Sequence, residues 1–439
     1  MNKLHITIKN MSVIMSKSIL QSTFIQRWFT VQQYDRFMFT MCLLYSLSAI
    51  PLLPINDLFK NIVLIGSLPI LLRCIVKKEG DLSILLLFLA AIIIQFLSWY
   101  NSLQAIPEHA YSSPRIKTLS ALFFFVLISF WVRGKKTRVL WLYASLIIGF
   151  IFTALYQQVL HNSLALGLSG QRIDLNMHNA QYTSMLSVVV IGLTLYITAN
   201  LPHRVNKVVK YALSTSAIVF ALYVLVISQS RQVWLALLAV LALSPLLFYR
   251  SVNLKRALVV YLCLTLASAT LFNVSFVKER VFDESGVISQ IADGKWDNIP
   301  MTSVGIRVNS WLEASKWIAR SPIIGSDRPS VSMVIRTSEK FRAQPWTLGF
   351  GHLHNFYMET LVSYGVVGLI FIILLYRAIF KNVWQGEDYR KNVLLLAFLI
   401  FWAIVNCFES YNTKNLGLYA HAIVLAGLFS YLPSRREPS

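Results

Sequence analysis

The sequence predicts an all-α polytopic membrane protein of about 12 transmembrane helices, with one large loop that contains helices. Three observations lead to this fold class. Of the 439 residues, 56% are hydrophobic and only 13% are charged. The apolar residues form runs near the ~20 residues that a helix needs to cross a bilayer. The basic residues gather in short clusters between those runs. A soluble domain of this composition would expose large apolar patches, so a membrane protein is the simpler explanation.

The expected spans follow the apolar runs in chain order. They cover residues 38–54, 58–76, 82–99, 118–133, 139–159, 181–200, 209–228, 233–249, 257–275, 355–376, 393–408 and 417–432. Pro51, Pro54 and Pro69 interrupt the first two. The chain then divides into an N-terminal segment (1–36), spans one to nine (37–275), a large loop (276–353), spans ten to twelve (354–433) and a tail (434–439).

Charge sets the expected orientation. The net charge is +21, but the basic residues are not interleaved on a soluble surface, which argues against a nucleic-acid partner. Instead they fall mainly on alternate connections, which the positive-inside rule assigns to the cytoplasm. Both termini are then cytoplasmic. The segment 1–36 has no compact apolar core with a cleavage site, so we expect it to be retained. The cysteines all lie in or beside apolar runs, and we expect no disulfide and no metal site from them.

The loop 276–353 is too long to take part in the charge rule, and loops of this length are usually functional or disordered. Its pattern predicts a helix over residues 303–320, which ends before Ser321-Pro322. Helical spacing puts Arg307 and Trp311 on one face. Arg307 is then either a solvated charge on an amphipathic helix or a residue aimed back at a site on the membrane surface.

A second feature is the stretch SQSRQVW (228–234), a tight outer connection between two apolar runs. Arg231 lies in it, at the expected membrane boundary. One interpretation is an arginine that snorkels to the interface. The other is an anion site, because a guanidinium matches phosphate oxygens bidentately.

The third feature is GHLHNFYMETLVSYGVVGL (351–369), where polar residues stand at the outer mouth of the tenth span. An ionisable residue at the head of a membrane helix is a functional hypothesis. His354 either caps the helix or acts as a proton acceptor near neutral pH. Asn355 and Glu359 are four residues apart and share a helix face.

Arg172 and Arg336 are further basic residues on the outer side, and each either lines a site or is a structural or rim charge. Together these features describe a pocket in which arginines hold a diphosphate leaving group and a histidine deprotonates a hydroxyl. No acidic cluster with metal-ligand spacing accompanies them, so we expect arginines in place of a metal ion.

This combination of twelve spans, one large loop before the tenth, SQSRQVW, GIRVNSWLEASKWIARSPIIGSD and HNFYMETLVSYGVVGL resembles the O-antigen ligase and polysaccharide polymerase superfamily of bacterial inner membranes. The motifs lie within about residues 165–370. The resemblance implies a periplasmic loop, a periplasmic active site and no cofactor. It also implies an inverting, metal-independent glycosyltransferase, with His354 as the catalytic residue and Arg231 and Arg307 on the diphosphate. Our own inference from the residues, separate from the resemblance, is that Asn355 or Glu359 orients the histidine.

The donor implied by the resemblance is O-antigen polysaccharide on undecaprenyl diphosphate, and the ligase branch uses lipid A–core as its acceptor. Chain length, the strongly basic balance and a single large loop favour the ligase, because lipopolysaccharide core is rich in phosphate. The alternative is an O-antigen polymerase, which uses a second lipid-linked glycan as acceptor. A protein O-oligosaccharyltransferase fits less well. A lipid or polysaccharide transporter is the alternative outside the enzymes, and it would show internal repeats or midplane charges.

Overall fold

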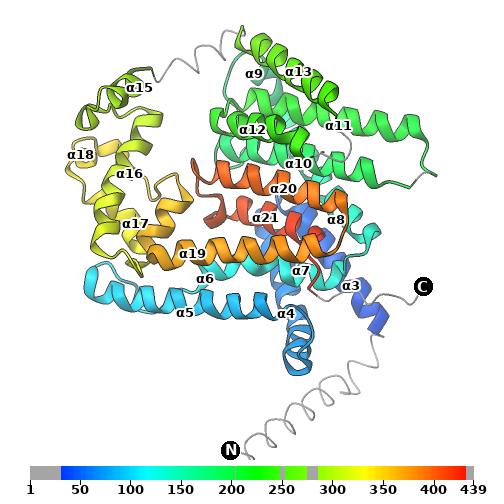
Figure 1. Ribbon diagram of the computed structural model, residues 1–439, viewed down its shortest axis with the longest axis horizontal. Helices are drawn as coiled ribbons and strands as arrows, with labels where there is room; N and C mark the ends of the chain where they lie inside the picture. Colours follow the sequence, from blue (N-terminus) through cyan, green and yellow to red (C-terminus); the bar gives the residue numbers. More distant parts are fainter. Residues whose placement is uncertain (1–30, 203, 248–252, 274–284, 432–439) are drawn as a thin grey trace, which may run out of the picture.

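The computed structural model describes residues 31–202, 204–247, 253–273 and 285–431, and all regular structure in these ranges is helical. Most of the expected N-terminal segment, the expected tail and residues 276–284 of the expected loop lie outside the described residues. Figure 1 shows long helices running side by side, with a group of shorter helices at one end. The described part of the chain therefore agrees with the all-α prediction.

Each of the twelve expected spans overlaps a helix. The long helices are α3 (Val31–Ser48), α4 (Leu53–Lys77), α5 (Leu82–Ala105), α6 with α7 (Lys117–Ser120 and Phe124–Val132), α8 (Lys136–His161), α10 (Ala180–Asn200), α11 (Lys207–Ile227), α12 (Arg231–Leu247), α13 (Leu254–Phe272), α19 (Phe356–Gln385), α20 (Tyr389–Val405) and α21 (Asn415–Leu428). A short helix, α9 (Ser163–Leu168), follows α8. Pro69 was expected to interrupt the second span, but α4 continues through it.

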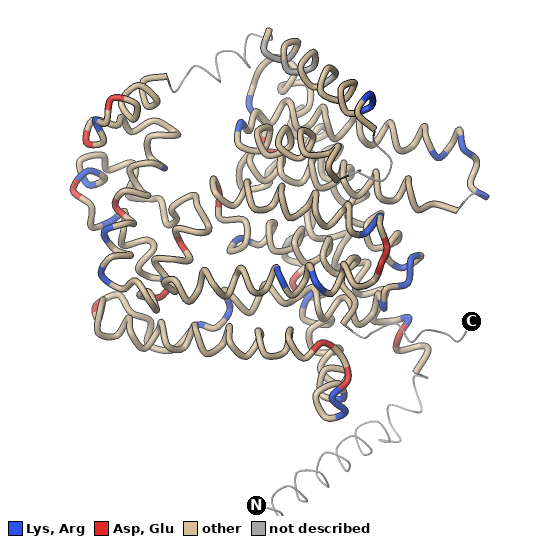
Figure 2. The backbone as a smooth tube through the Cα atoms, in the orientation of Figure 1, with Lys and Arg blue, Asp and Glu red and all other residues tan. Residues whose placement is uncertain are grey.

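Six of the described helices are long and apolar enough to cross a membrane: those of α4, α5, α8, α10, α11 and α19. Three shorter apolar helices are the α6–α7 segment, α12 and α21. These helices indicate a multi-pass membrane protein, while the count of twelve stays a prediction. In Figure 2, Lys and Arg gather in the connections at the end of the bundle opposite the short helices.

The centre of the bundle is α10, in which most residues are buried on every side of the helix. It packs against α8, α11 and α20. Burial on all sides places α10 in the interior of the bundle, together with several polar side chains, such as Thr183 and Ser184. The N-terminal end of α10 carries a glutamine, Gln181, that is 8% exposed. This polar residue marks the mouth of the bundle where the candidate site lies.

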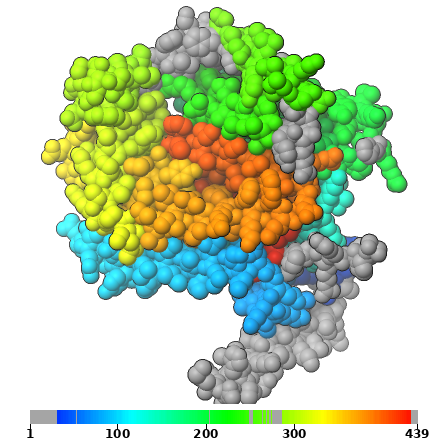
Figure 3. All heavy atoms as spheres, in the orientation of Figure 1, coloured from blue at the N-terminus to red at the C-terminus, as the bar shows by residue number. Residues whose placement is uncertain are grey.

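The shorter helices are α15 (Ser285–Ala292), α16 (Ser303–Arg320), α17 (Asp327–Arg336) and α18 (Glu339–Arg342). The bounds of α16 confirm the helix predicted in the loop. Of these helices, α16, α17 and α18 share a small apolar core that includes Ile306, Val334 and Phe341, and Val362 of α19 joins it. In Figure 3 they cover one end of the bundle and meet α5 and α19 there. The loop is thus packed onto the membrane helices through α19.

A kink in α19 receives the segment that follows α16. Gly365 has φ 61° and ψ −162°, which is not helical. The kink leaves the next two backbone N–H groups without partners inside the helix. They donate instead to loop carbonyls, from Val366 to Pro322 at 2.8 Å and from Val367 to Ile323 at 3.2 Å. The Tyr-Gly pair of the sequence motif therefore provides a backbone docking site for the loop.

We expect Gly365→Ala to destabilise the protein by at least about 2 kcal/mol, because this backbone region is open almost only to glycine. A Cβ there would also lie 2.3 Å from the Ile323 carbonyl. Thermal unfolding in detergent measures the change. Gly349→Ala is the matched control, since a Cβ at Gly349 meets nothing within 4 Å. Equal melting temperatures for the two variants would contradict the proposed docking.

Candidate active site

His354 stands at the point where the loop becomes α19. Asn355 is the N-cap of this helix, and its side chain accepts hydrogen bonds from the backbone N–H groups of Tyr357 and Met358. An asparagine at this position satisfies donors that the first turn of a helix leaves unpaired. His354 itself has φ 50°, an uncommon value for a residue with a side chain. The cap thus fixes where the helix starts and keeps the imidazole outside it.

The imidazole of His354 pairs with a carboxylate that sequence analysis did not find. His354 Nδ1 lies 3.1 Å from Oε2 of Glu409, in the connection between α20 and α21. Glu409 is fully buried, and its Oε1 accepts from the backbone N–H of Ser410 at 3.0 Å. Burial alone would raise the pKa of Glu409, but the contacts with His354, His352 and Ser410 lower it to about 2. The carboxylate is therefore ionised at neutral pH.

The ionised state of Glu409 decides the tautomer of His354. A carboxylate can only accept hydrogen bonds, so Nδ1 of the imidazole must carry the proton that it donates. In the neutral imidazole, the other ring nitrogen, Nε2, then keeps a lone pair. This is the arrangement in which a histidine can take a proton from a hydroxyl group.

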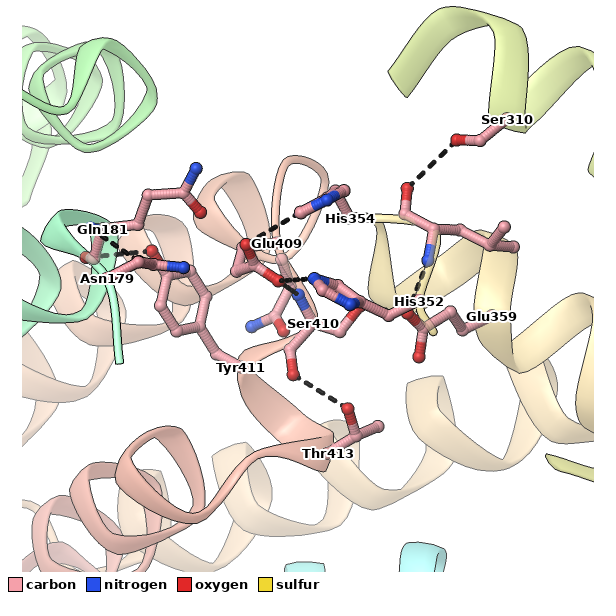
Figure 4. Close-up of polar contacts among 12 residues, drawn as sticks. Asn179, Gln181, Ser310, His352, His354, Glu359, Glu409, Ser410, Tyr411 and Thr413 are labelled. Atoms are coloured by element: carbon pink, nitrogen blue, oxygen red, sulfur yellow. Dashed lines mark hydrogen bonds and ion pairs between the residues drawn. The ribbon is translucent and has the colours of Figure 1, made fainter. Parts of the chain in front are cut away.

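A second histidine shares the same carboxylate. His352 Nε2 lies 3.5 Å from Oε1 of Glu409, and the ring centroids of His352 and His354 are 4.0 Å apart. Figure 4 shows the Glu409 carboxylate beside both imidazoles, with a contact to each. Burial and the neighbouring His354 lower the pKa of His352 to about 4, so this imidazole is neutral at pH 7. These three residues are a group that could hold a metal ion.

A glutamine connects this cluster to Arg307 of α16. The Gln181 side chain lies between Glu409 and Arg307, and a carboxylate requires the amide nitrogen while a guanidinium requires the amide oxygen. In that orientation Gln181 donates to Glu409 and accepts from Arg307 Nη2 at 2.7 Å. Two intervening side chains thus join Arg307 to His354.

The SQSRQVW turn reaches the same place. The Gln181 amide nitrogen lies 3.0 Å from Nε2 of Gln232, the residue after Arg231. Arg231 is the first residue of α12 and is half-buried. In the same turn, the Ser228 carbonyl accepts from Arg172 Nε at 3.4 Å. The segments that carry Arg172 and Arg231 therefore meet the mouth of α10 where Gln181 lies.

Tyr411 lies close enough to the charged residues of the site for them to shift the pKa of its hydroxyl. Burial and then Glu409 raise the pKa of its hydroxyl, while Arg307 and Arg172 oppose that rise. The Tyr411 hydroxyl donates a hydrogen bond to the backbone carbonyl of Gln181 at 3.1 Å. The charges of Glu409, Arg307 and Arg172 therefore all act on this one hydroxyl. The site combines a cationic side with a histidine–carboxylate pair.

Glu359 has a different place from the one expected. We predicted that Asn355 or Glu359 orients His354, but the imidazole partner in the structure is Glu409. Glu359 is fully buried in the first turn of α19. It accepts from the backbone N–H of Leu353 at 3.0 Å, from Ser410 Oγ at 2.6 Å and from Arg328 Nη1 at 2.8 Å. Glu359 therefore ties together the backbone segments that precede His354 and follow Glu409.

The remaining sequence candidate lies at the surface. Arg336 is the last residue of α17 and is exposed, and its carbonyl accepts from Arg342. Among the described contacts none links it to the His354 cluster, so its geometry fits a rim charge. The structure thus brings His354 and Arg307 into one cluster, places the Arg231 and Arg172 segments beside it, and leaves Arg336 outside.

Comparison with known proteins finds a similarity in the central part of the chain. Residues 216–373 match the family described as O-antigen ligase. This range contains Arg231, Arg307 and His354 and ends before Glu409. An uncharacterized protein of Haemophilus influenzae (strain ATCC 51907 / DSM 11121 / KW20 / Rd) is 27% identical over 214 residues, which cover 46% of this chain and 52% of that protein. The chain thus spans about half the length of that relative.

The family match covers the sequence motifs and part of the cluster, namely Arg307, His352 and His354, while Gln181 and Glu409 lie outside it. It includes the SQSRQVW turn, all of α16, the docking segment, and the head of α19 with its kink at Gly365. Residues 216–373 of the chain are therefore similar to the O-antigen ligase family.

Proposed function

We propose that this protein is an O-antigen ligase, which transfers O-antigen polysaccharide from undecaprenyl diphosphate to lipid A–core. The observation that carries the proposal is the convergence of His354, Glu409 and Arg307 at one mouth of a membrane helix bundle. A lipid-linked donor and a lipid-anchored acceptor both present their reacting groups at a membrane surface. A site at the end of the bundle meets both of them there.

The reaction is a direct displacement. Glu409 accepts a hydrogen bond from the Nδ1–H of His354, and the Nε2 lone pair takes the proton of an acceptor hydroxyl. The oxygen then attacks the anomeric carbon and its bond to the diphosphate breaks. Attack from the face opposite the leaving group inverts that carbon. The arrangement parallels a histidine oriented by a buried carboxylate, which holds the ring in the productive tautomer.

The diphosphate leaves with two bonding electrons and needs a cationic partner. We assign this role to Arg231 and Arg307, with Arg172 nearby, because fixed guanidinium groups stabilise charge that develops in the transition state. With arginines in that role, transfer needs no metal ion. The site would lie on the periplasmic side of the bacterial inner membrane, where the large loop covers the bundle.

We expect Arg307→Lys to lower kcat/KM for transfer by about 10²-fold, because an ammonium cannot bind a diphosphate as a bidentate fork and also reach Gln181 in the same way. A reconstituted transfer assay measures the change. Arg336→Lys is the matched control, since Arg336 lies in the same loop but outside the cluster, and it should keep near-normal rates. Equal losses in both variants would remove Arg307 from the site.

The assay that tests the function uses purified protein, lipid-linked O-antigen and lipid A–core in detergent with a chelator present. A ladder of glycan-capped lipid A–core supports the ligase. Longer lipid-linked chains without capped core would instead identify a polymerase. Folded protein that transfers no glycan to either acceptor would overturn the proposal and favour a transporter.

A further inference from the structure

The pair of histidines and the buried carboxylate have the geometry of a metal site. The three residues each offer a ligand atom, and these atoms lie within 4.8 Å of one another. The contacts from Glu409 are 3.1 Å to His354 Nδ1 and 3.5 Å to His352 Nε2. Ligand atoms around a tetrahedral zinc with bonds of ~2.0–2.1 Å are separated by roughly 3.3 Å. A Zn²⁺ ion therefore fits between these atoms with only small side-chain movements.

The surroundings of the cluster favour a bound ion. The Glu409 carboxylate is already held by the Ser410 N–H and by Gln181, and outer partners of this kind orient metal ligands. Two imidazoles and one carboxylate are donors that select Zn²⁺ over Mg²⁺ or Ca²⁺, which prefer oxygen ligands. Both histidine side chains keep some exposure, 20% for His352 and 14% for His354, which leaves an entry path.

We propose that His352, His354 and Glu409 form an inhibitory Zn²⁺ site. Zn²⁺ binds Nδ1 of His354 and displaces the proton held there to solvent, and Nε2 takes up a proton from solvent in exchange. The neutral ring then carries its single N–H proton on Nε2. Nε2 has no lone pair in that tautomer, so it cannot accept the proton of a hydroxyl. The ion thus blocks the base without any covalent change, and its removal restores the original tautomer.

The binding part of this inference stands on geometry alone, whereas its effect on transfer rests on the proposed function. The two are separated by measuring binding directly. ZnCl₂ is titrated into the purified full-length protein in detergent by calorimetry, with any oligohistidine tag removed. We expect one site per chain, and no comparable heat from MgCl₂.

Two variants test whether Zn²⁺ binds at the proposed residues. His352→Phe keeps an aromatic ring beside His354 but removes one ligand atom. It should weaken Zn²⁺ binding by more than about 100-fold, beyond the ~10–100-fold cost of losing an outer partner. His109→Ala is the control, because His109 is an exposed histidine of another loop, and it should bind Zn²⁺ as the natural chain does. Undiminished binding by His352→Phe, or no binding by the natural chain, would overturn the site.

The transfer assay then tests the consequence. Zn²⁺ at concentrations that fill the site should abolish glycan transfer, and excess EDTA should restore it. If Zn²⁺ binds at this site but transfer continues unchanged, the inhibitory role is wrong. If the natural chain shows no transfer at all, the proposed function fails, while the binding measurement still decides whether the site exists.

Discussion

His354→Ala should abolish glycan transfer, with a fall in rate of about 10²–10⁴-fold or to background. The alanine removes the only nitrogen that Glu409 orients toward an acceptor hydroxyl in the proposed mechanism. The measurement is the rate of appearance of capped lipid A–core with saturating donor and acceptor. Donor binding should survive, because the diphosphate is assigned to the arginines.

The same substitution should leave the fold intact. His354 lies before the first turn of α19, and the helix is capped by the side chain of the next residue, Asn355. His109→Ala serves as a control for loss of an exposed histidine. Transfer by His354→Ala at the rate of the natural chain would show that this residue only occupies the helix mouth.

Glu409→Gln should lower the transfer rate by about 10²–10⁴-fold while His354 remains in place. A glutamine amide can turn its nitrogen toward Nδ1, and the imidazole must then carry its proton on Nε2, which removes the base. The substitution is nearly isosteric, so binding of donor should change little. The measurement is kcat with both substrates saturating, together with donor affinity.

Glu409→Asp separates the chemical role from a structural one. Aspartate keeps the charge and the acceptor oxygens, so it should recover part of the activity that glutamine loses. A structural role would instead predict similar rates for both variants and a lower melting temperature. Full activity in Glu409→Gln would contradict the assignment of Glu409 as the residue that positions His354.

Some parts of this structure could be predicted from the sequence because local chemistry fixes them. The helix α16 has the bounds that its pattern predicted. Thr302 caps its start by accepting from the Gly305 N–H, and Ser321-Pro322 follows its end. The head of α19 was also recognisable, since polar residues stood beside an apolar run. Both signals depend only on residues that are close together in the sequence.

The partners of His354 could not be predicted in the same way. Glu409 is 55 residues further along the chain, and only the packing of α19 against the end of α20 brings the two together. A carboxylate beside an apolar run is a signal that could have drawn attention to it. Gln181 offers no such signal, because an uncharged amide in an apolar helix does not stand out.

The expected role of Asn355 or Glu359 in orienting His354 shows how a correct spacing can accompany a wrong partner. Four residues of helix do place two side chains on one face. Asn355, however, has an extended backbone as the N-cap, so the helix begins only after it. Glu359 then faces inward to Arg328, Ser410 and the Leu353 N–H. The spacing of residues within α19 could not predict which side chains from other segments pack against this helix.

The most direct test of the central claim, a direct displacement by a hydroxyl that His354 activates, is the anomeric configuration of the new linkage. The natural protein is supplied with lipid-linked O-antigen of known configuration and lipid A–core, with a chelator present, and the capped product is analysed by NMR. The mechanism predicts an inverted linkage formed without metal. A retained configuration would indicate a covalent glycosyl–enzyme intermediate and would contradict the roles assigned to His354 and Glu409.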